Sequence, residues 1–337
     1  MIEFSIIIPF QTVTPYLFET LSHISKLTGP DFEVILLPDA LPPDDSLPAN
    51  IPGSEKNYSL KIIPTGAVSP AVKRDKGAEA SCGRYLAFID DDAYPDAGWL
   101  SEVLPHFSDK SIAGVGGPQI TPEQDGFWQK VSGAMFLSPL NGQSVCRYYP
   151  CRKSFFVDDW PSVNLIIRKK DFMAVGGFDS DYWPGEDTKL CLDIIEKQNK
   201  KIIYEPNAKV FHHRRAGFFK HMKQVGNYGL HRGYFAKRFP ATSFRLSYML
   251  PSCFFLFACL GWLLLFAGGF SAFLYKCGWV IYFSAILFSI YGIFIKLKDI
   301  SIALASAPYI IGTHFWYGFR FLQGFVFVKD LKSKLGR

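Results

Sequence analysis

The first 245 residues alternate short apolar runs with polar segments. Runs such as Phe4–Ile8 and Phe32–Leu37 have the length and composition of buried parallel strands. Strands and helices that alternate with short links predict an α/β fold with a doubly wound, mixed but mostly parallel sheet. The expected strands are residues 4–8, 32–37, 60–63, 85–89, 114–120, 163–167, 202–204 and 209–211, and the expected helices are 15–26, 71–83, 99–107 and 189–196. Residues 38–57 and 121–160 are expected to be irregular.

From about Tyr248 onward the sequence becomes almost continuously apolar. Met249–Phe270 and Cys277–Ile295 carry no charge and are long enough to cross a hydrocarbon core of about 30 Å as helices. A third apolar segment, residues 300–328, is expected to be interfacial or re-entrant, and a third crossing is the alternative. Basic residues flank the first two segments and predict a hairpin with both ends on the cytoplasmic side; they are Lys237, Arg238, Arg245, Lys296 and Lys298.

Composition and charge narrow the class of protein. The formal net charge is +6, and the lysines and arginines are concentrated beside the apolar segments. This distribution indicates a membrane edge rather than a nucleic-acid surface. Seven cysteines without CxxC spacing indicate free thiols in a reducing cytoplasm. The N-terminus lacks the charged and long apolar regions of a signal peptide, so we expect the N-terminal domain to stay in the cytosol.

The apolar run Tyr85–Ile89 leads directly into Asp90-Asp91-Asp92. Carboxylates at the end of a buried strand need partners, because a desolvated charge is costly. A divalent cation that is shared with a phosphate would satisfy several of them at once. The stretch therefore indicates a nucleoside-diphosphate site, with an acidic surface turn as the alternative for this segment alone.

Seven short motifs occur along the chain in a fixed order. They are Ser5-Ile6-Ile7-Ile8-Pro9, Val34–Asp39, Lys73-Arg74-Asp75, Asp90-Asp91-Asp92, Gly176-Gly177-Phe178-Asp179, Gly185-Glu186-Asp187 and His212-His213. Together they resemble glycosyltransferase family 2, the GT-A nucleotide-sugar transferases, over about residues 4–232. The resemblance implies a GT-A fold and the transfer of a sugar from a nucleoside-diphosphate donor.

The resemblance also implies roles for individual residues. Asp187 is the implied general base, and Glu186 beside it would orient the loop or the acceptor. The implied ligands of a Mg²⁺ or Mn²⁺ ion are Asp92, Asp90 and His212. The implied contacts to the nucleotide are Pro9, Asp39, Arg74, Asp90 and Asp91.

Each of these motifs also has a purely structural interpretation. Asp39 could be a turn residue after Pro38, and Arg74 could lie on a helix surface. Glu186 and Asp187 could simply complement the N-terminus of a helix. The two histidines could belong to a basic patch beside the membrane, although an extended backbone would point them in opposite directions.

These observations favour a membrane-anchored, metal-dependent, non-processive glycosyltransferase, and the resemblance implies inversion at the anomeric carbon. A UDP-sugar is the expected donor, and a membrane-associated glycan or lipid-linked molecule is the expected acceptor. The Gln-x-x-Arg-Trp motif of processive synthases is absent, because Gln224 is followed by Val225-Gly226-Asn227-Tyr228. The alternatives are a polyprenyl-phosphate sugar transferase and a non-catalytic membrane scaffold. We expect a cytoplasmic catalytic domain over residues 1–240, a membrane region over 246–328 and a basic tail over 329–337.

Overall fold

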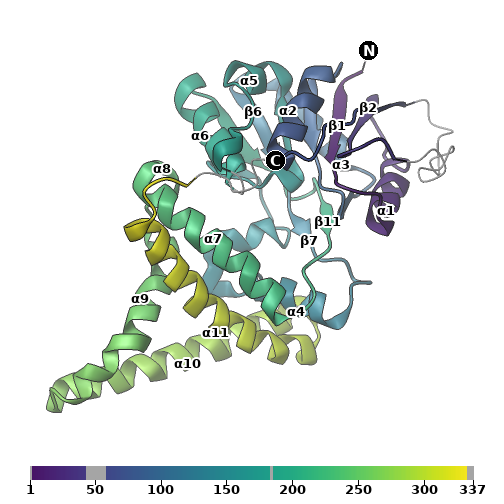
Figure 1. Cartoon of the computed structure of the whole chain (residues 1–337). Coiled ribbons are helices and arrows are strands. Elements are labelled where there is room, and N and C mark those ends of the chain that lie inside the picture. Colours follow the sequence, from purple (N-terminus) through teal and green to yellow (C-terminus); the bar gives the residue numbers. More distant parts are fainter. Residues whose placement is uncertain (1, 43–57, 183–184, 332–337) are drawn as a thin grey trace. The chain divides into compact units, whose positions relative to one another are not determined.

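The structure is a computed structural model and describes residues 2–42, 58–182 and 185–331 (Figure 1). The chain divides into two compact units. Unit 1 contains Met1–Ile120 and Tyr149–His213, and unit 2 contains Thr121–Tyr148 and Arg214–Leu331. Most of the loop predicted over residues 38–57 and of the basic tail predicted over 329–337 lies outside the described residues. The domain boundaries expected from the sequence stay a prediction.

Unit 1 contains the strands and helices of an α/β fold. Its strands are β1 (Phe4–Pro9), β2 (Phe32–Leu37), β3 (Ser59–Ile62), β4 (Tyr85–Phe88), β5 (Ala93–Pro95), β6 (Ile112–Gly116), β7 (Gln119–Ile120), β8 (Phe155–Val157), β9 (Leu165–Arg168), β10 (Lys201–Tyr204) and β11 (Val210–His212). Its α-helices are α1 (Pro15–Ile24), α2 (Pro70–Ala80), α3 (Trp99–Val103), α5 (Lys169–Ala174) and α6 (Glu186–Gln198). Helix α2 packs on β1 and β2, and α6 packs on β10.

Eight of these strands form one mixed sheet in the order β3-β2-β1-β4-β9-β6-β10-β8. Strands β1 to β4 run parallel to one another, whereas β9 is antiparallel to both β4 and β6. Every residue of β1, β2 and β4 is buried, which explains their nearly continuous apolar sequences. The doubly wound mixed sheet predicted from the sequence is confirmed.

The strand order reverses beside β1, because β2 lies on one side of it and β4 on the other. Such a switch point creates a crevice outside the carboxyl ends of the strands, where α/β sheets bind their ligands. Strand β1 ends at Pro9, and Asp39 and Asp90 follow β2 and β4 at the same edge. The topology therefore brings three of the predicted site residues to one edge of the sheet.

A second, three-stranded sheet has the order β5-β11-β7. Strand β11 is antiparallel to β5, and its register pairs His212 with Ala93. Because Ala93 directly follows Asp92, this pairing carries His212 to the acidic turn after β4. Strand β5 has only three residues, directly follows the acidic turn and ends at Pro95, and it was not predicted from the sequence.

Unit 2 is helical. Its α-helices are α4 (Phe127–Met135), α7 (Phe218–Arg238), α8 (Pro240–Ser243), α9 (Leu246–Leu260), α10 (Gly269–Leu297) and α11 (Ile300–Leu322), with a 3₁₀ turn over Pro139–Arg147, another over Gly261–Leu265 and a π-helical turn over Gln323–Phe327. Helix α11 packs against α4, α7, α9 and α10. The expectation that residues 121–160 are irregular is wrong at α4, where apolar side chains at helical spacing are buried in unit 2.

Two segments of unit 2 are long and apolar enough to cross a membrane: Leu246–Leu265 and Gly269–Leu297. They overlap the two segments predicted from the sequence, but the break between them lies earlier than expected. Gly268 and Gly269 have φ angles of 65° and 49°, a conformation that glycine adopts without strain, and they form the turn. Lys276, which lies between the two predicted segments, is consequently part of α10, and its side chain is exposed.

The expectation of seven free thiols is wrong at two positions. Cys146 and Cys151 are disulfide-bonded, whereas Cys82, Cys191, Cys253, Cys259 and Cys277 are free. The two bonded cysteines are five residues apart in the chain, a spacing that matches no CxxC or zinc-finger pattern and therefore gave no signal.

Candidate active site

The acidic turn after β4 forms the centre of the candidate site. The chain leaves the buried strand through Ile89, and the amide of Ala93 donates to the carbonyl of Asp90 at 3.2 Å, which closes the turn. Asp90 and Asp92 are only partly buried. The turn therefore presents carboxylates at the carboxyl end of the sheet without burying them completely.

His212 reaches this turn from the three-stranded sheet. Its Nε2 lies 3.2 Å from Asp92 Oδ1, and the next amide, that of His213, donates to the Asp92 carbonyl at 3.0 Å. The His212 Nδ1 lies 2.8 Å from Gln119 Oε1. Because an amide oxygen can only accept, Nδ1 is the donor to Gln119, which leaves Nε2 as the ring nitrogen that faces Asp92.

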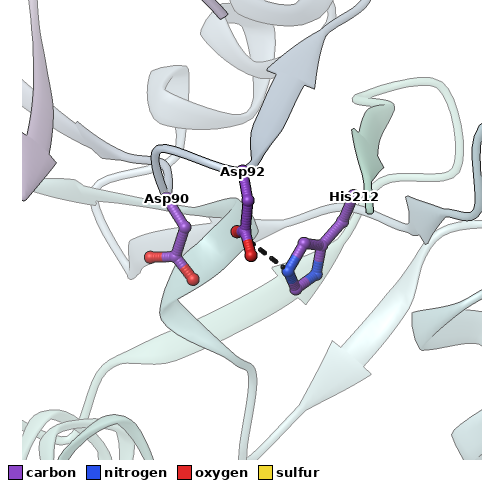
Figure 2. Close-up of side chains that lie close together, drawn as sticks. All are labelled: Asp90, Asp92 and His212. Atoms are coloured by element: carbon purple, nitrogen blue, oxygen red, sulfur yellow. Dashed lines mark ion pairs between the residues drawn. The ribbon is translucent and has the colours of Figure 1, made fainter. Parts of the chain in front are cut away.

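Asp92 and His212 face each other, and Asp90 lies beside them (Figure 2). One ligand atom from each of them lies within 4.8 Å of the other two. Two carboxylates and an imidazole whose orientation is fixed by its hydrogen bond to Gln119 are a donor set that fits a divalent cation. The sequence prediction that these three side chains lie together agrees with this geometry, while their role as metal ligands stays a prediction.

His213 turns away from the cluster, as the extended backbone predicted. Its Nε2 lies 2.9 Å from Glu19 Oε2, and its ring stacks on that of Tyr16 with 4.3 Å between the centroids. His213 thus ties β11 to helix α1 and leaves His212 to face the acids.

A buried arginine connects the acidic turn to helix α6. Arg74 Nη2 donates to Asp90 Oδ1 at 2.6 Å, and Arg74 Nη1 donates to Glu186 Oε1 at 3.1 Å. Arg74 and Glu186 are each 4% exposed, so the interpretation of Arg74 as a surface residue is wrong. The sequence contains a signal for this burial, because Arg74 shares a helix face with the small residues Ala71 and Ala78.

Glu186 and Asp187 begin helix α6 and have different environments. Burial, helped by the neighbouring charge of Asp187, raises the pKa of Glu186 to about 8 against the opposing charge of Arg74. Asp187 is only partly buried, and its Oδ1 accepts from the amide of Thr188 at 2.7 Å. The Thr188 hydroxyl donates in turn to the buried Asp159 at 2.9 Å, which fixes the start of the helix. Of the two acids, Asp187 is the more accessible.

Sequence reasoning did not single out Lys73 as a site residue. Its side chain is 2% exposed, and Nζ donates to the carbonyls of Phe10 and Leu37 and to Asp39 Oδ1. Lys73 therefore ties together the carboxyl ends of β1 and β2. The sequence gives little indication that Lys73 is buried: it only places Lys73 next to Arg74, which shares a helix face with small residues.

The remaining predicted nucleotide contacts occupy the same edge of the sheet. Pro9 is the last residue of β1, and the next residue, Phe10, accepts a hydrogen bond from Lys73 through its carbonyl. Asp91 lies between the two clustered aspartates, and its carbonyl accepts from the hydroxyl of Thr20 at 3.4 Å. Asp91 is not among the three residues whose ligand atoms cluster.

Comparisons with known proteins agree with this architecture. The family model described as Glycosyl transferase family 2 matches residues 5–159, and the one described as Glycosyl transferase family group 2 matches residues 85–310. The second match spans more than half of the chain, and the chain therefore belongs to glycosyltransferase family 2.

Two curated relatives match part of the chain. It is 34% identical over 147 residues to a pre-mycofactocin glycosyltransferase of Mycobacterium tuberculosis, a match covering 43% of this chain and 30% of that protein. It is 23% identical over 152 residues to a glucosyl-dolichyl phosphate glucuronosyltransferase of Haloferax volcanii, covering 41% of this chain and 46% of that protein. The matches thus span less than half the length of both relatives.

A solved structure is similar over most of the chain. It is a mannosyltransferase of Pyrobaculum calidifontis in complex with GDP-Man and Mn²⁺, and it superposes with a TM-score of 0.60 at 15% sequence identity. The match covers 92% of this chain and 87% of that chain. The predicted GT-A fold is thereby confirmed.

Proposed function

We propose that this chain is a metal-dependent glycosyltransferase that moves a sugar from a nucleoside-diphosphate donor to a membrane-associated acceptor. The observation that carries the proposal is the convergence of Asp90, Asp92 and His212 at the carboxyl edge of the sheet. Membership of glycosyltransferase family 2 supports it. Without the Gln-x-x-Arg-Trp motif, the chain is proposed to add single sugars.

Asp90, Asp92 and His212 would hold the divalent cation. An imidazole among the ligands suits Mn²⁺ better than Mg²⁺. When bound there, the ion would act as a Lewis acid that offsets the charge developing on the departing nucleoside diphosphate. Gln119 would keep His212 in the tautomer that binds metal through Nε2.

Asp187 is proposed as the general base. It would accept the proton of the acceptor hydroxyl while that oxygen attacks the anomeric carbon and the nucleoside diphosphate leaves. Attack from the face opposite the leaving group would invert the configuration, as the family resemblance implies. Glu186 is too deeply buried and too closely paired with Arg74 for this task, and we assign it a positioning role.

The nucleoside would lie over the carboxyl ends of β1 and β2. Pro9, Asp39, Asp91 and Arg74 are the proposed contacts, with Lys73 fixing the Asp39 carboxylate. A carboxylate at Asp39 can accept a hydrogen bond from a base N–H. A UDP-sugar is the proposed donor, and a GDP-sugar is the donor to test beside it, since the similar mannosyltransferase was solved with GDP-Man.

The acceptor is proposed to be lipid-linked or a membrane-associated glycan. Helices α9 and α10 would anchor the chain as a hairpin, with basic residues on the cytoplasmic side of the bilayer. Helix α11 is proposed to be interfacial, since it packs on the other helices of unit 2. The Haloferax volcanii relative, named for a dolichyl phosphate-linked sugar, supports a lipid-linked acceptor.

The test is sugar transfer by the full chain in detergent. Radiolabelled UDP-sugars and GDP-sugars are incubated with a lipid extract and Mn²⁺, and label in the lipid fraction is counted. Asp187→Asn should lower kcat about 10²- to 10⁴-fold, whereas Asp181→Asn, at an exposed acid of the same unit, should not. Transfer that survives Asp187→Asn would favour the alternative in which a polyprenyl phosphate is the acceptor, because a phosphate needs little help from a base. Absence of transfer from every donor would contradict the proposal.

A further inference from the structure

A cavity in unit 1 lies at the edge of the main sheet opposite the acidic turn, and its volume is about 420 Å³. Strands β4 and β9 are antiparallel, and Tyr85, the first residue of β4, pairs with Arg168, the last residue of β9. The residues that line the cavity precede β4, end β9 or belong to α5: Gly83, Arg84, Arg168, Lys169, Lys170 and Met173. Strand β4 runs from this cavity toward Asp90, and its four residues span about 13 Å. The cavity is therefore separate from the candidate active site.

The cavity is strongly basic. Four of its six lining residues are arginine or lysine, and no acidic residue lines it in the part of the chain that the structure describes. Arg84 and Lys170 are exposed, and neither side chain pairs with a carboxylate among the described residues. Asp171, which follows Lys170, is buried and does not line the cavity. The lining side chains therefore offer positive charge to a ligand.

Arg168 places a buried guanidinium group in the wall of this cavity, with only 3% of the residue exposed. Its Nε donates to the Ile112 carbonyl at 2.7 Å, and its Nη2 donates to the carbonyls of Phe107 and of Asp109. The Cζ also lies 4.9 Å from the ring centroid of Phe107, so the plane of the group is fixed from two sides. The described residues offer Nη1 no acceptor, and its two N–H donors are available to a ligand.

Hydrogen bonds join the two segments that form the walls of the cavity. The Lys169 Nζ donates to the Ser81 carbonyl at 2.7 Å, and the Lys169 amide donates to the Arg84 carbonyl at 3.0 Å. The Gly83 amide donates to the buried Ser5 Oγ at 2.9 Å, which ties the loop before β4 to β1. The basic side chains thus extend from a backbone whose position is fixed before any ligand binds.

We propose that this cavity is a second ligand site and that it binds a small phosphate ester. A guanidinium group of fixed orientation matches the oxygens of a phosphate, and Arg84 and Lys170 add positive charge around it. A volume of about 420 Å³ is that of a small-molecule site and exceeds what a phosphate ion fills. Met173, which is 44% exposed, offers a polarizable apolar surface to the organic part of the ester. The inference does not rest on the proposed function.

The probe is phenyl phosphate, titrated calorimetrically into the full chain in a neutral detergent that contains EDTA, with inorganic phosphate as the second arm. Phenyl phosphate should bind at least threefold more tightly than inorganic phosphate, because its ring can contact Met173. Lys170→Gln and Arg84→Gln should each weaken binding of phenyl phosphate about tenfold. Lys153→Gln is the matched control and should leave the affinity unchanged, because Lys153 is exposed in the same unit but does not line the cavity.

Four outcomes would overturn the inference or part of it. If neither probe binds, the cavity is not a phosphate site. If Lys153→Gln and Lys170→Gln weaken binding equally, the probes respond only to the general positive charge of the chain. If binding requires Mn²⁺, the ligand is held at the acidic turn and not in this cavity. Equal affinity for inorganic phosphate would keep a phosphate site here but overturn its assignment to an ester. Arg84→Gln provides the test if Lys170→Gln changes the folding of the chain.

Discussion

Arg74 links two parts of the candidate site, and replacing it with Met tests whether that link is structural. The guanidinium group donates to Asp90 at 2.6 Å and to Glu186 at 3.1 Å. Its Cζ also lies 5.6 Å from the ring centroid of Phe178. Met is long and unbranched, so Arg74→Met keeps much of the packing while it removes the positive charge.

The two ion pairs are not equivalent. The Asp90 side chain is 30% exposed, so losing that pair costs about 0–1 kcal/mol. The Glu186 side chain is 5% exposed, and leaving a buried charge without its partner costs about 3–5 kcal/mol. Glu186 can relieve part of this cost by taking up a proton, because burial already raises its pKa to about 8. We therefore expect a loss of about 3 kcal/mol at pH 8 and a clearly smaller loss at pH 5.

The assay is thermal unfolding of the full chain in detergent at both pH values. For a unit of roughly 150–250 residues, 3 kcal/mol corresponds to a fall in Tm of about 6–12 °C. Arg84→Met is the matched control, because Arg84 is exposed and also contacts an aromatic ring, that of Tyr85. The double variant Arg74→Met with Glu186→Gln should recover at least half of the loss, since no buried charge then remains. Additive effects of the two substitutions, or equal losses in the Arg74 and Arg84 variants, would refute the reasoning.

Two further predictions concern other parts of the fold. Burial raises the pKa of Asp75 from 3.8 to about 7, so the folded chain holds a proton that the unfolded chain releases, and stability falls as pH rises from about 4 to about 7. Asp75→Asn can still accept from the Phe178 amide and should therefore stabilise the chain by about 2 kcal/mol at pH 8 and not at pH 4. This is about half of what the full pKa change implies, because the side chain keeps some exposure. Equal shifts in Tm at both pH values would contradict this prediction. A Cβ at Gly233 would meet the backbone of Phe321 on α11, so Gly233→Leu should lower Tm by several degrees. Gly126→Ala should not lower Tm, because only a side-chain atom lies near Gly126. An unchanged Tm for Gly233→Leu would show that α7 and α11 do not pack as described.

The sequence carried enough information for the main sheet and for the position of the acids. Buried parallel strands are continuous apolar runs, and the point where each run ends locates the carboxyl edge. The positions of Asp39 and Asp90 at one edge therefore follow from the apolar pattern alone. Arg74 could have been placed as well, because its spacing from Ala71 and Ala78 puts it on a buried helix face.

Other parts of the site depend on contacts that local sequence does not encode. His212 reaches Asp92 through a sheet whose strands are two or three residues long, and its partner Gln119 lies in the shortest of them. Helix α7 contains Gly226, Gly229 and Gly233, which lower helix propensity. These glycines allow a close approach to α11 that stabilises the helix through packing, and a single-sequence pattern cannot reveal that.

The central claim is that carboxylates of the turn after β4 and His212 hold a cation that binds the donor's diphosphate. Calorimetric titration of UDP and of GDP into the full chain, with and without Mn²⁺, tests it most directly. Binding of one of them should require Mn²⁺ and weaken at least tenfold in Asp92→Asn but not in Asp31→Asn, at an exposed acid of the same unit. Binding that is absent, independent of Mn²⁺ or equal in the two variants would contradict the account and favour a non-catalytic scaffold.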